Sequence, residues 1–253
     1  AFSTPAGAVD ALRNPSLSVR FMAWQAIQKF ASQAVAPLTK LAADSNPRVR
    51  ARAIWALGKL PSQGNEALQL ALADKDANLR MTGIRLARQL GIPVEKYAAR
   101  VIRDASPQVR RELAVALRFD KSPAMPKLWS ELAEQHDGKD RWYLEALGIG
   151  AELRWSECLA AYMQASSSAT AQSRRDIIWR SRAPEASGEV AKLLADPNLP
   201  ASEVPRMLRA LDFHNSKDRT TALQSLLVST KATSNAEQER RDALGSGTDP
   251  PGG

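Results

Sequence analysis

The apolar positions in the first half of the chain follow a helical pattern that recurs in units of thirty residues. Each unit is marked by an arginine, and apolar residues four and seven positions after it lie on one face of an α-helix. The arginines are Arg20, Arg50, Arg80 and Arg110. The apolar residues that follow them are Trp24, Ile54, Ile84 and Ala114, and then Ile27, Leu57, Ala87 and Leu117. A second, shorter apolar segment, such as residues 66–73, lies between successive arginine helices, so each unit is predicted to be a pair of helices.

An aspartate recurs with the same period and stands six residues before each of three arginines, in the turn expected between two helices. A carboxylate at that place can accept hydrogen bonds from the amides at a helix N-terminus, and guanidinium groups can bridge successive repeats. A general base there would need a neighbouring acid or nucleophile, which the sequence does not supply. We therefore predict a structural ladder made of Asp44, Arg50, Asp74, Arg80, Asp104 and Arg110.

Residues 44–60, Asp-Ser-Asn-Pro-Arg-Val-Arg-Ala-Arg-Ala-Ile-Trp-Ala-Leu-Gly-Lys-Leu, resemble a HEAT repeat of the short bacterial type that is also called the PBS-lyase type. This resemblance implies an all-α fold, a right-handed α-solenoid of helical hairpins. A fifth unit keeps the frame but has Asp140 in the arginine position, followed by Leu144, Leu147 and Gly148. We expect the ladder to end at that unit.

Beyond residue 155 the thirty-residue spacing decays while helical patterns persist. We predict three parts: regular HEAT-like repeats over residues 1–154, degenerate helical repeats or a cap continuous with the solenoid over 155–228, and a flexible tail or linker over 229–253. The last part is rich in Ser, Thr, Glu, Arg and Gly and ends in Pro-Pro-Gly-Gly, so it cannot bury apolar surface. Because the chain starts at Ala1 without Met or an apolar signal core, we expect a processed product or an excised piece.

Outside the apolar stripe, the second helix of each unit carries residues that change from repeat to repeat. In α-solenoids these helices line the concave side, so they form a candidate partner-binding surface. Cations beside aromatic rings can hold phosphates and stack bases, or hold an acidic protein surface. An ordinary solvated face remains the alternative. The residues are Lys29, Arg52, Trp55, Lys59, Arg85, Arg88, Arg111, Arg118 and Trp142.

The charge of the whole chain agrees with such a surface without specifying its partner. Thirty-five Lys and Arg against 27 Asp and Glu give a formal charge of +8, which favours acidic partners by long-range attraction. The cations are spread along the chain, as is typical of solvated helix faces. The longest apolar run, residues 158–163, is far below the roughly 20 residues that cross a bilayer, so no membrane insertion is expected.

Candidate catalytic and cofactor chemistry is sparse. The single Cys158 lies in an apolar helical pattern and is predicted to be a buried, inert thiol, and the sequence has no Cys-x-x-Cys-His for haem. His136 lies near three carboxylates in a turn that lacks the regular alternation of a calcium loop, and His214 has no second histidine at ligand spacing. Most of the tryptophans, Trp24 included, are expected in the core. We predict no cofactor, no metal and no catalytic residue, and hence no enzyme in the isolated chain.

Four further segments, residues 18–27, 137–151, 175–183 and 209–214, narrow the resemblance. Together they are similar to the helical middle region of the large bacterial proteins called membrane-bound dehydrogenases. In that family a β-propeller precedes the HEAT repeats and a c-type cytochrome domain follows them. The resemblance implies an exported or periplasmic redox protein in which this chain is the spacer, although the chain itself has neither propeller strands nor a haem motif.

Three functional hypotheses follow. The first is a non-catalytic scaffold that binds a protein partner or the neighbouring domains of the same polypeptide. The second is a nucleic-acid-binding protein or DNA glycosylase with a basic concave face, which requires an aspartate beside exposed aromatic residues. The third, a bilin lyase with related short HEAT repeats, has no further supporting motif.

Overall fold

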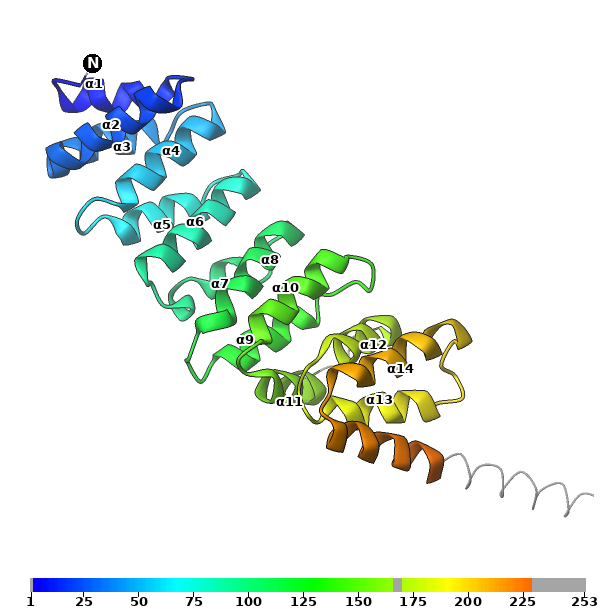
Figure 1. Ribbon diagram of the computed structural model, residues 1–253. Helices are drawn as coiled ribbons and strands as arrows, with labels where there is room; N and C mark the ends of the chain where they lie inside the picture. Colours follow the sequence, from blue (N-terminus) through cyan, green and yellow to red (C-terminus); the bar gives the residue numbers. More distant parts are fainter. Residues whose placement is uncertain (1, 166–169, 229–253) are drawn as a thin grey trace, which may run out of the picture.

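The computed structural model describes residues 2–165 and 170–228, and these form an elongated stack of helices (Figure 1). No strand occurs in these residues. The first helices are α1 (Pro5–Asp10), α2 (Leu17–Phe30), α3 (Val35–Leu41), α4 (Pro47–Gly58), α5 (Gly64–Leu72), α6 (Ala77–Leu90) and α7 (Ala98–Val101). They are followed by α8 (Pro107–Ala116), α9 (Met125–Ala133), α10 (Arg141–Ala151), α11 (Trp155–Ala165), α12 (Ala171–Arg180), α13 (Ala186–Ala195) and α14 (Val204–Ala210).

The repeat pattern becomes a row of hairpins. Helix α5 packs on α4 and α6, and α8 packs on α6 and α10, so each hairpin contacts the next along the stack. The predicted all-α solenoid is confirmed. The helices α2, α4, α6, α8 and α10 carry the recurring apolar stripe, and we call them the second helices.

Local sequence explains where the second helices begin. Pro47 and Pro107 occupy the first position of α4 and α8, where the missing amide costs nothing. The side chain of Asn46 accepts a hydrogen bond from the Arg48 amide, and Asp76 does the same for Asn78 at the start of α6. At the other end of α6, Gly91 has a φ of +68°, the left-handed conformation that favours glycine after a helix.

The core runs along the stack in three clusters that overlap in sequence. The largest extends from Leu68 to Ala186 and includes Trp155, Cys158 and Tyr162 of α11 beside Trp129 of α9. It therefore continues across residue 154, the predicted end of the regular repeats. Residues 229–253, expected to be a tail, lie outside the described residues.

One core prediction is wrong. Trp24 occupies the same place in its unit as the buried Ile54 and Ile84, yet 38 % of its surface is exposed. It lies on α2, the first of the second helices, where it borders a surface cavity together with Arg52 and Trp55 of α4. Its ring stacks with the exposed Phe21 at a centroid distance of 6.3 Å.

Candidate binding surface

The recurring arginines and aspartates join one hairpin to the next. Arg50 donates from Nη1 to the carbonyl oxygens of Asp44 and Ser45, at 3.0 and 3.1 Å, in the loop before its own helix. Its Nε and Nη2 donate to the two carboxylate oxygens of Asp74, in the following loop, at 2.7 and 2.9 Å. Arg80 repeats this arrangement with the Asp74 carbonyl and the Asp104 carboxylate. Each of these guanidinium groups therefore ties two loops together.

Each aspartate also holds its own loop. Oδ1 of Asp74 accepts the Asp76 amide at 2.8 Å, and Oδ1 of Asp104 accepts the Ser106 amide at 2.8 Å. Burial raises the pKa of Asp74, but the Arg50 guanidinium and the Asp76 amide outweigh burial, so this pKa lies below its ordinary value. The charged groups of these arginines and aspartates are therefore engaged in structural contacts and are not available to a ligand.

The two ends of the ladder differ from its middle. Arg20 donates from Nη1 to the carbonyl oxygens of Asn14 and Pro15, but the aspartate 24 positions later, Asp44, pairs with Arg13 instead. At the other end, Arg110 lies 5.5 Å from the ring centroid of Tyr143. Asp140, in the arginine position of the fifth unit, caps α10 by accepting the Tyr143 amide.

Most cations of the predicted partner-binding surface are already paired with carboxylates. Arg85 and Arg88 share Glu112 at 2.7 and 3.4 Å. Arg111 lies 3.5 Å from Asp140, and Arg118 lies 2.6 Å from Glu152. This central part of the surface is therefore closer to electrical neutrality than its arginines alone would suggest.

The remaining predicted residues lie at the N-terminal end or are isolated. Lys29 is exposed, and Trp142 is 71 % exposed on α10. Lys59 lies 5.6 Å above the ring of Trp55, a cation–π contact. Arg52 donates from Nη1 to the Leu12 carbonyl at 2.8 Å. Burial lowers the pKa of Arg52, and the positive charges of Arg20 and Arg48 lower it further.

Arg52 and Trp55 border a cavity of about 320 Å³, which we call the N-terminal pocket. Helices α2, α4 and α6 and the turn after α1 supply its walls, which are mostly apolar. The hydroxyl of Thr82 is committed to the Asn78 carbonyl of its own helix at 2.7 Å. The lining residues used below are Leu12, Arg20, Trp24, Arg52, Trp55 and Thr82.

A larger cavity of about 630 Å³ lies between α6 and the segment after α8. Asp120 and the exposed Phe119 stand next to each other on its wall, together with Arg88 and Tyr97. The Tyr97 hydroxyl and Oδ2 of Asp120 are buried without a hydrogen-bond partner. Burial raises the pKa of Tyr97 to about 12, so its hydroxyl stays protonated and can donate.

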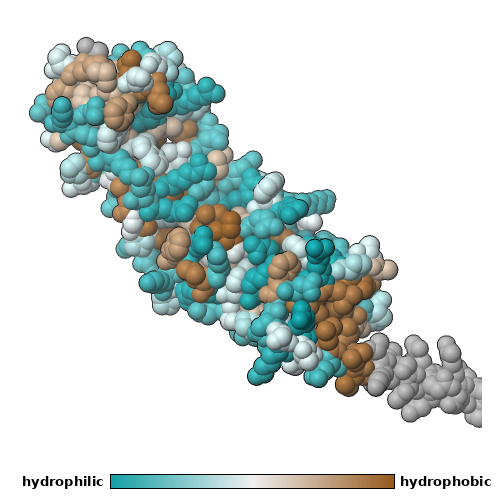
Figure 2. Space-filling view, in the orientation of Figure 1, coloured by the Kyte–Doolittle hydropathy of each residue, from teal (hydrophilic) through white to brown (hydrophobic). Residues whose placement is uncertain are grey.

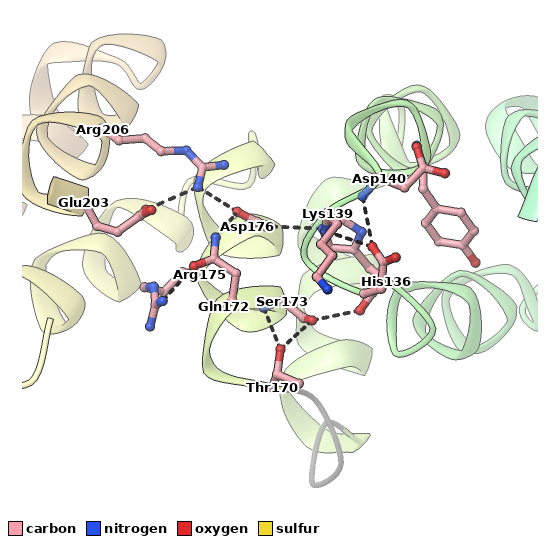
Figure 3. Close-up of polar contacts among 12 residues, drawn as sticks. His136, Lys139, Asp140, Thr170, Gln172, Ser173, Arg175, Asp176, Glu203 and Arg206 are labelled. Atoms are coloured by element: carbon pink, nitrogen blue, oxygen red, sulfur yellow. Dashed lines mark hydrogen bonds and ion pairs between the residues drawn. The ribbon is translucent and has the colours of Figure 1, made fainter. Parts of the chain in front are cut away.

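A buried polar cluster that the sequence did not predict joins the loop before α10 to α12 and α14 (Figure 3). Nε2 of His136 lies 3.0 Å from Oδ2 of Asp176, and the other carboxylate oxygen accepts from Arg206 at 2.7 Å and from Gln172 at 3.0 Å. Burial raises the pKa of Asp176, but contacts with His136 and Arg206 lower it more. His136 and Asp176 are 40 positions apart, so no local motif indicates the pair.

The carboxylates near His136 do not gather around a common point. Asp137 accepts the amides of Lys139 and Asp140, so it shapes the turn. In residues 2–165 and 170–228 no group of three or more His, Cys, Asp or Glu is placed to hold a metal ion. Among the same residues, none of the helices combines the length and the apolar character of a membrane-spanning segment.

Comparison with known proteins adds a family likeness for the first part of the chain. Residues 5–70 match the family model of HEAT repeats. The match covers α1 to α4 and most of α5, the region in which the arginine ladder begins. No curated protein matches the chain in sequence.

Among solved structures, the chain is similar to the X-ray structure of the Escherichia coli protein YibA, at 15 % identity and a TM-score of 0.46 over 87 % of this chain and 91 % of that one. It is also similar to a designed armadillo repeat protein, at 16 % identity and a TM-score of 0.29 over 87 % and 99 % of the two chains. A second designed armadillo repeat protein, in complex with a (KR)4 peptide, matches at 15 % identity and a TM-score of 0.29 over 90 % and 99 %.

Hydrophobic side chains also gather on the surface at the C-terminal end of the stack, as Figure 2 shows. Exposed large apolar residues at this end are Leu208, Phe213, Leu223, Leu227 and Val228. They lie on α14, on the turn after it and on the helical segment of residues 216–228. This area and the N-terminal pocket lie at opposite ends of the molecule.

Proposed function

We propose that the chain is a non-catalytic scaffold that binds protein through the second helices. The observation that carries this proposal is that structural contacts and exposed surface are formed by different residues of the same helices. Arg50 and Arg80 hold neighbouring hairpins together, whereas the variable residues of the same helices face outward and form pockets. A repeat that joins its units with one set of residues and varies another is suited to displaying a binding surface.

A binding experiment on the whole chain tests this function. The chain would carry a photo-crosslinker and would be used to recover its partner from source cells. Reversing the charge of Arg85 on α6, Arg111 on α8 and Arg118 in the turn after α8 is expected to abolish recovery. The matched control reverses the charge of Lys40 and Lys127, which are exposed on α3 and α9. Equal recovery by both variants would contradict the proposal.

We further propose that the partner domains belong to the same, larger polypeptide, as the spacer of an exported redox protein. The support is the resemblance of residues 137–151 and three shorter segments to the helical region of membrane-bound dehydrogenases. An antibody against this chain would be used on fractions of source cells. A large, haem-positive, exported band would support the spacer role. A haem-free band near 27.5 kDa would overturn it and would leave a stand-alone scaffold.

A second candidate function, nucleic-acid binding or base excision, is favoured by one observation. Asp120 stands beside the exposed Phe119 in the larger cavity, which is the pairing that a glycosylase site requires. A titration with duplex DNA at two salt concentrations distinguishes this function from non-specific attraction of DNA to a positively charged scaffold. A specific DNA site predicts measurable affinity near physiological salt and an affinity that falls steeply as the salt concentration rises. Non-specific attraction to a chain of charge +8 predicts weak binding, and only at low salt.

A further inference from the structure

The N-terminal pocket lies beside three guanidinium groups that lack carboxylate partners. Arg20, Arg48 and Arg52 form no ion pair within residues 2–165 and 170–228. Arg20 and Arg52 line the pocket, and each contacts backbone carbonyl oxygens through Nη1. This local excess of positive charge differs from the centre of the surface, where Glu112 compensates Arg85 and Arg88.

Arg20, like Arg110 at the other end of the ladder, is a ladder arginine that forms no ion pair within the described residues. Arg50 and Arg80 use Nε and Nη2 to hold both oxygens of a carboxylate in the next loop. The corresponding atoms of Arg20 have no hydrogen-bond partner in the part of the chain that the structure describes, since Arg13 pairs with Asp44. The same two atoms are therefore available for a carboxylate from another molecule.

The pocket also provides an apolar site for a side chain. Trp24 and Trp55 border it, and Leu12 with Ala51 and Ala56 of α4 complete its walls. Large aromatic residues in a pocket bordered by arginine are typical of the positions that dominate protein–protein affinity. A volume of about 320 Å³ accommodates an amino-acid side chain with part of its backbone.

We propose that the N-terminal pocket binds an acidic peptide segment, which inserts an apolar side chain between Trp24 and Trp55 and pairs its carboxylates with Arg20 and Arg52. This inference rests on the proposed protein-binding function and names one site of the second-helix surface, at its N-terminal end, and the class of partner segment that it binds. A nucleic-acid base fits less well, because the walls are mostly apolar and the polar groups that line them, the Arg20 and Arg52 guanidinium groups and the Thr82 hydroxyl, leave few acceptors for the amino groups on the edge of a base.

Fluorescence polarisation with synthetic peptides tests the inference on the full chain. The probe is a short labelled peptide rich in glutamate and leucine. Two matched peptides replace leucine by serine or glutamate by lysine, and a labelled single-stranded oligonucleotide serves as the nucleic-acid probe. Binding of the first peptide alone, weakened by salt, is expected. Equal binding of the serine peptide would show attraction by charge alone and would overturn the inference, as would stronger binding of the oligonucleotide or no binding at all.

Variants then locate the site. Arg20→Gln and Trp24→Ser are each expected to weaken peptide binding by about tenfold or more. The controls are Arg103→Gln, whose partner is Glu131, and Leu153→Ser, which removes an exposed apolar side chain outside the pocket. Circular dichroism verifies that each variant folds. If Arg20→Gln fails to fold, Arg52→Lys tests the same pocket, because it keeps the positive charge but loses the planar guanidinium group that binds a carboxylate through two hydrogen bonds. Weaker peptide binding is then expected.

Pocket variants that bind like the original chain would overturn the inference. The proposed function would still stand if charge reversal at Arg85, Arg111 and Arg118 abolished partner recovery. The two failures are therefore distinguishable.

Discussion

Arg80 on α6 holds both carboxylate oxygens of Asp104, which lies in the loop before α8, through Nε at 2.6 Å and Nη2 at 2.8 Å. The same guanidinium group donates from Nη1 to the Asp74 carbonyl at 2.9 Å in the loop before its own helix. Both side chains are largely buried, with 17 % and 7 % of their surfaces exposed. One side chain thus sets the distance between two successive hairpins.

Removing this contact is expected to destabilise the stack. Arg80→Ala leaves the Asp104 carboxylate without its charged partner, and we expect a loss of about 1–2 kcal/mol in the free energy of unfolding. The measurement is the midpoint of urea unfolding by circular dichroism. The control is Arg103→Ala, because Arg103 pairs with Glu131 while 71 % of its side chain is exposed, and this change is expected to cost no more than about 0.5 kcal/mol. Equal effects of the two substitutions would contradict the ladder's structural role.

The ladder also predicts a dependence of stability on pH. Burial raises the pKa of Asp104, but the Arg80 guanidinium and the Ser106 amide outweigh burial and place its pKa below the ordinary value of 3.8. The ionised carboxylate is therefore favoured in the folded chain. Its stabilisation is fully present above the unfolded-state pKa and is lost as the pH falls through the lower folded-state pKa.

Asp104→Asn removes this titration, so the difference in urea midpoint between the variant and the original chain should shrink as the pH falls below about 4. Denaturation curves at a series of pH values measure it. A difference that stays constant across this range would show that Asp104 does not titrate in this way.

Two glycines in helices predict changes of opposite sign. A Cβ at Gly150 of α10 would collide with the backbone carbonyl oxygen of Ala114 on α8, where two second helices approach closely. Gly150→Ala is therefore expected to destabilise the chain by roughly 1–3 kcal/mol. At Gly188 of α13 nothing lies within 4 Å of a new Cβ, so Gly188→Ala is expected to stabilise the chain by about 0.5–1 kcal/mol. Thermal unfolding of both variants compares them, and the same sign for both would refute this account of α8–α10 packing.

The single thiol reports on the opening of the largest core cluster. Cys158 is fully buried against Met125, and burial raises its pKa to about 12, so the reactive thiolate is scarce at neutral pH. Alkylation by iodoacetamide is expected to be slow in the native chain and fast in urea. Mass spectrometry over time measures the rate. Fast alkylation without denaturant would place Cys158 at the surface.

The sequence alone determined the repeated unit, because helical periodicity and a thirty-residue period are local properties of the chain. The positions of Ile54 and Ile84 in the core follow from that periodicity. The same argument failed for Trp24, because it borders a surface cavity, and the formation of a cavity depends on how neighbouring helices pack. The predicted boundaries at residues 154 and 228 and the dehydrogenase resemblance remain predictions.

The tertiary structure alone decided which charged groups are compensated. Arg85 meets Glu112 across 27 positions and His136 meets Asp176 across 40, in contacts between separate hairpins that no local pattern reveals. Arg20 and Arg50 occupy the same position of their repeats in the sequence, yet Arg50 has a carboxylate partner and Arg20 lines an apolar pocket without one. The physical reason is that an ion pair requires two groups within about 4 Å, and distances between hairpins are set by how the helices pack.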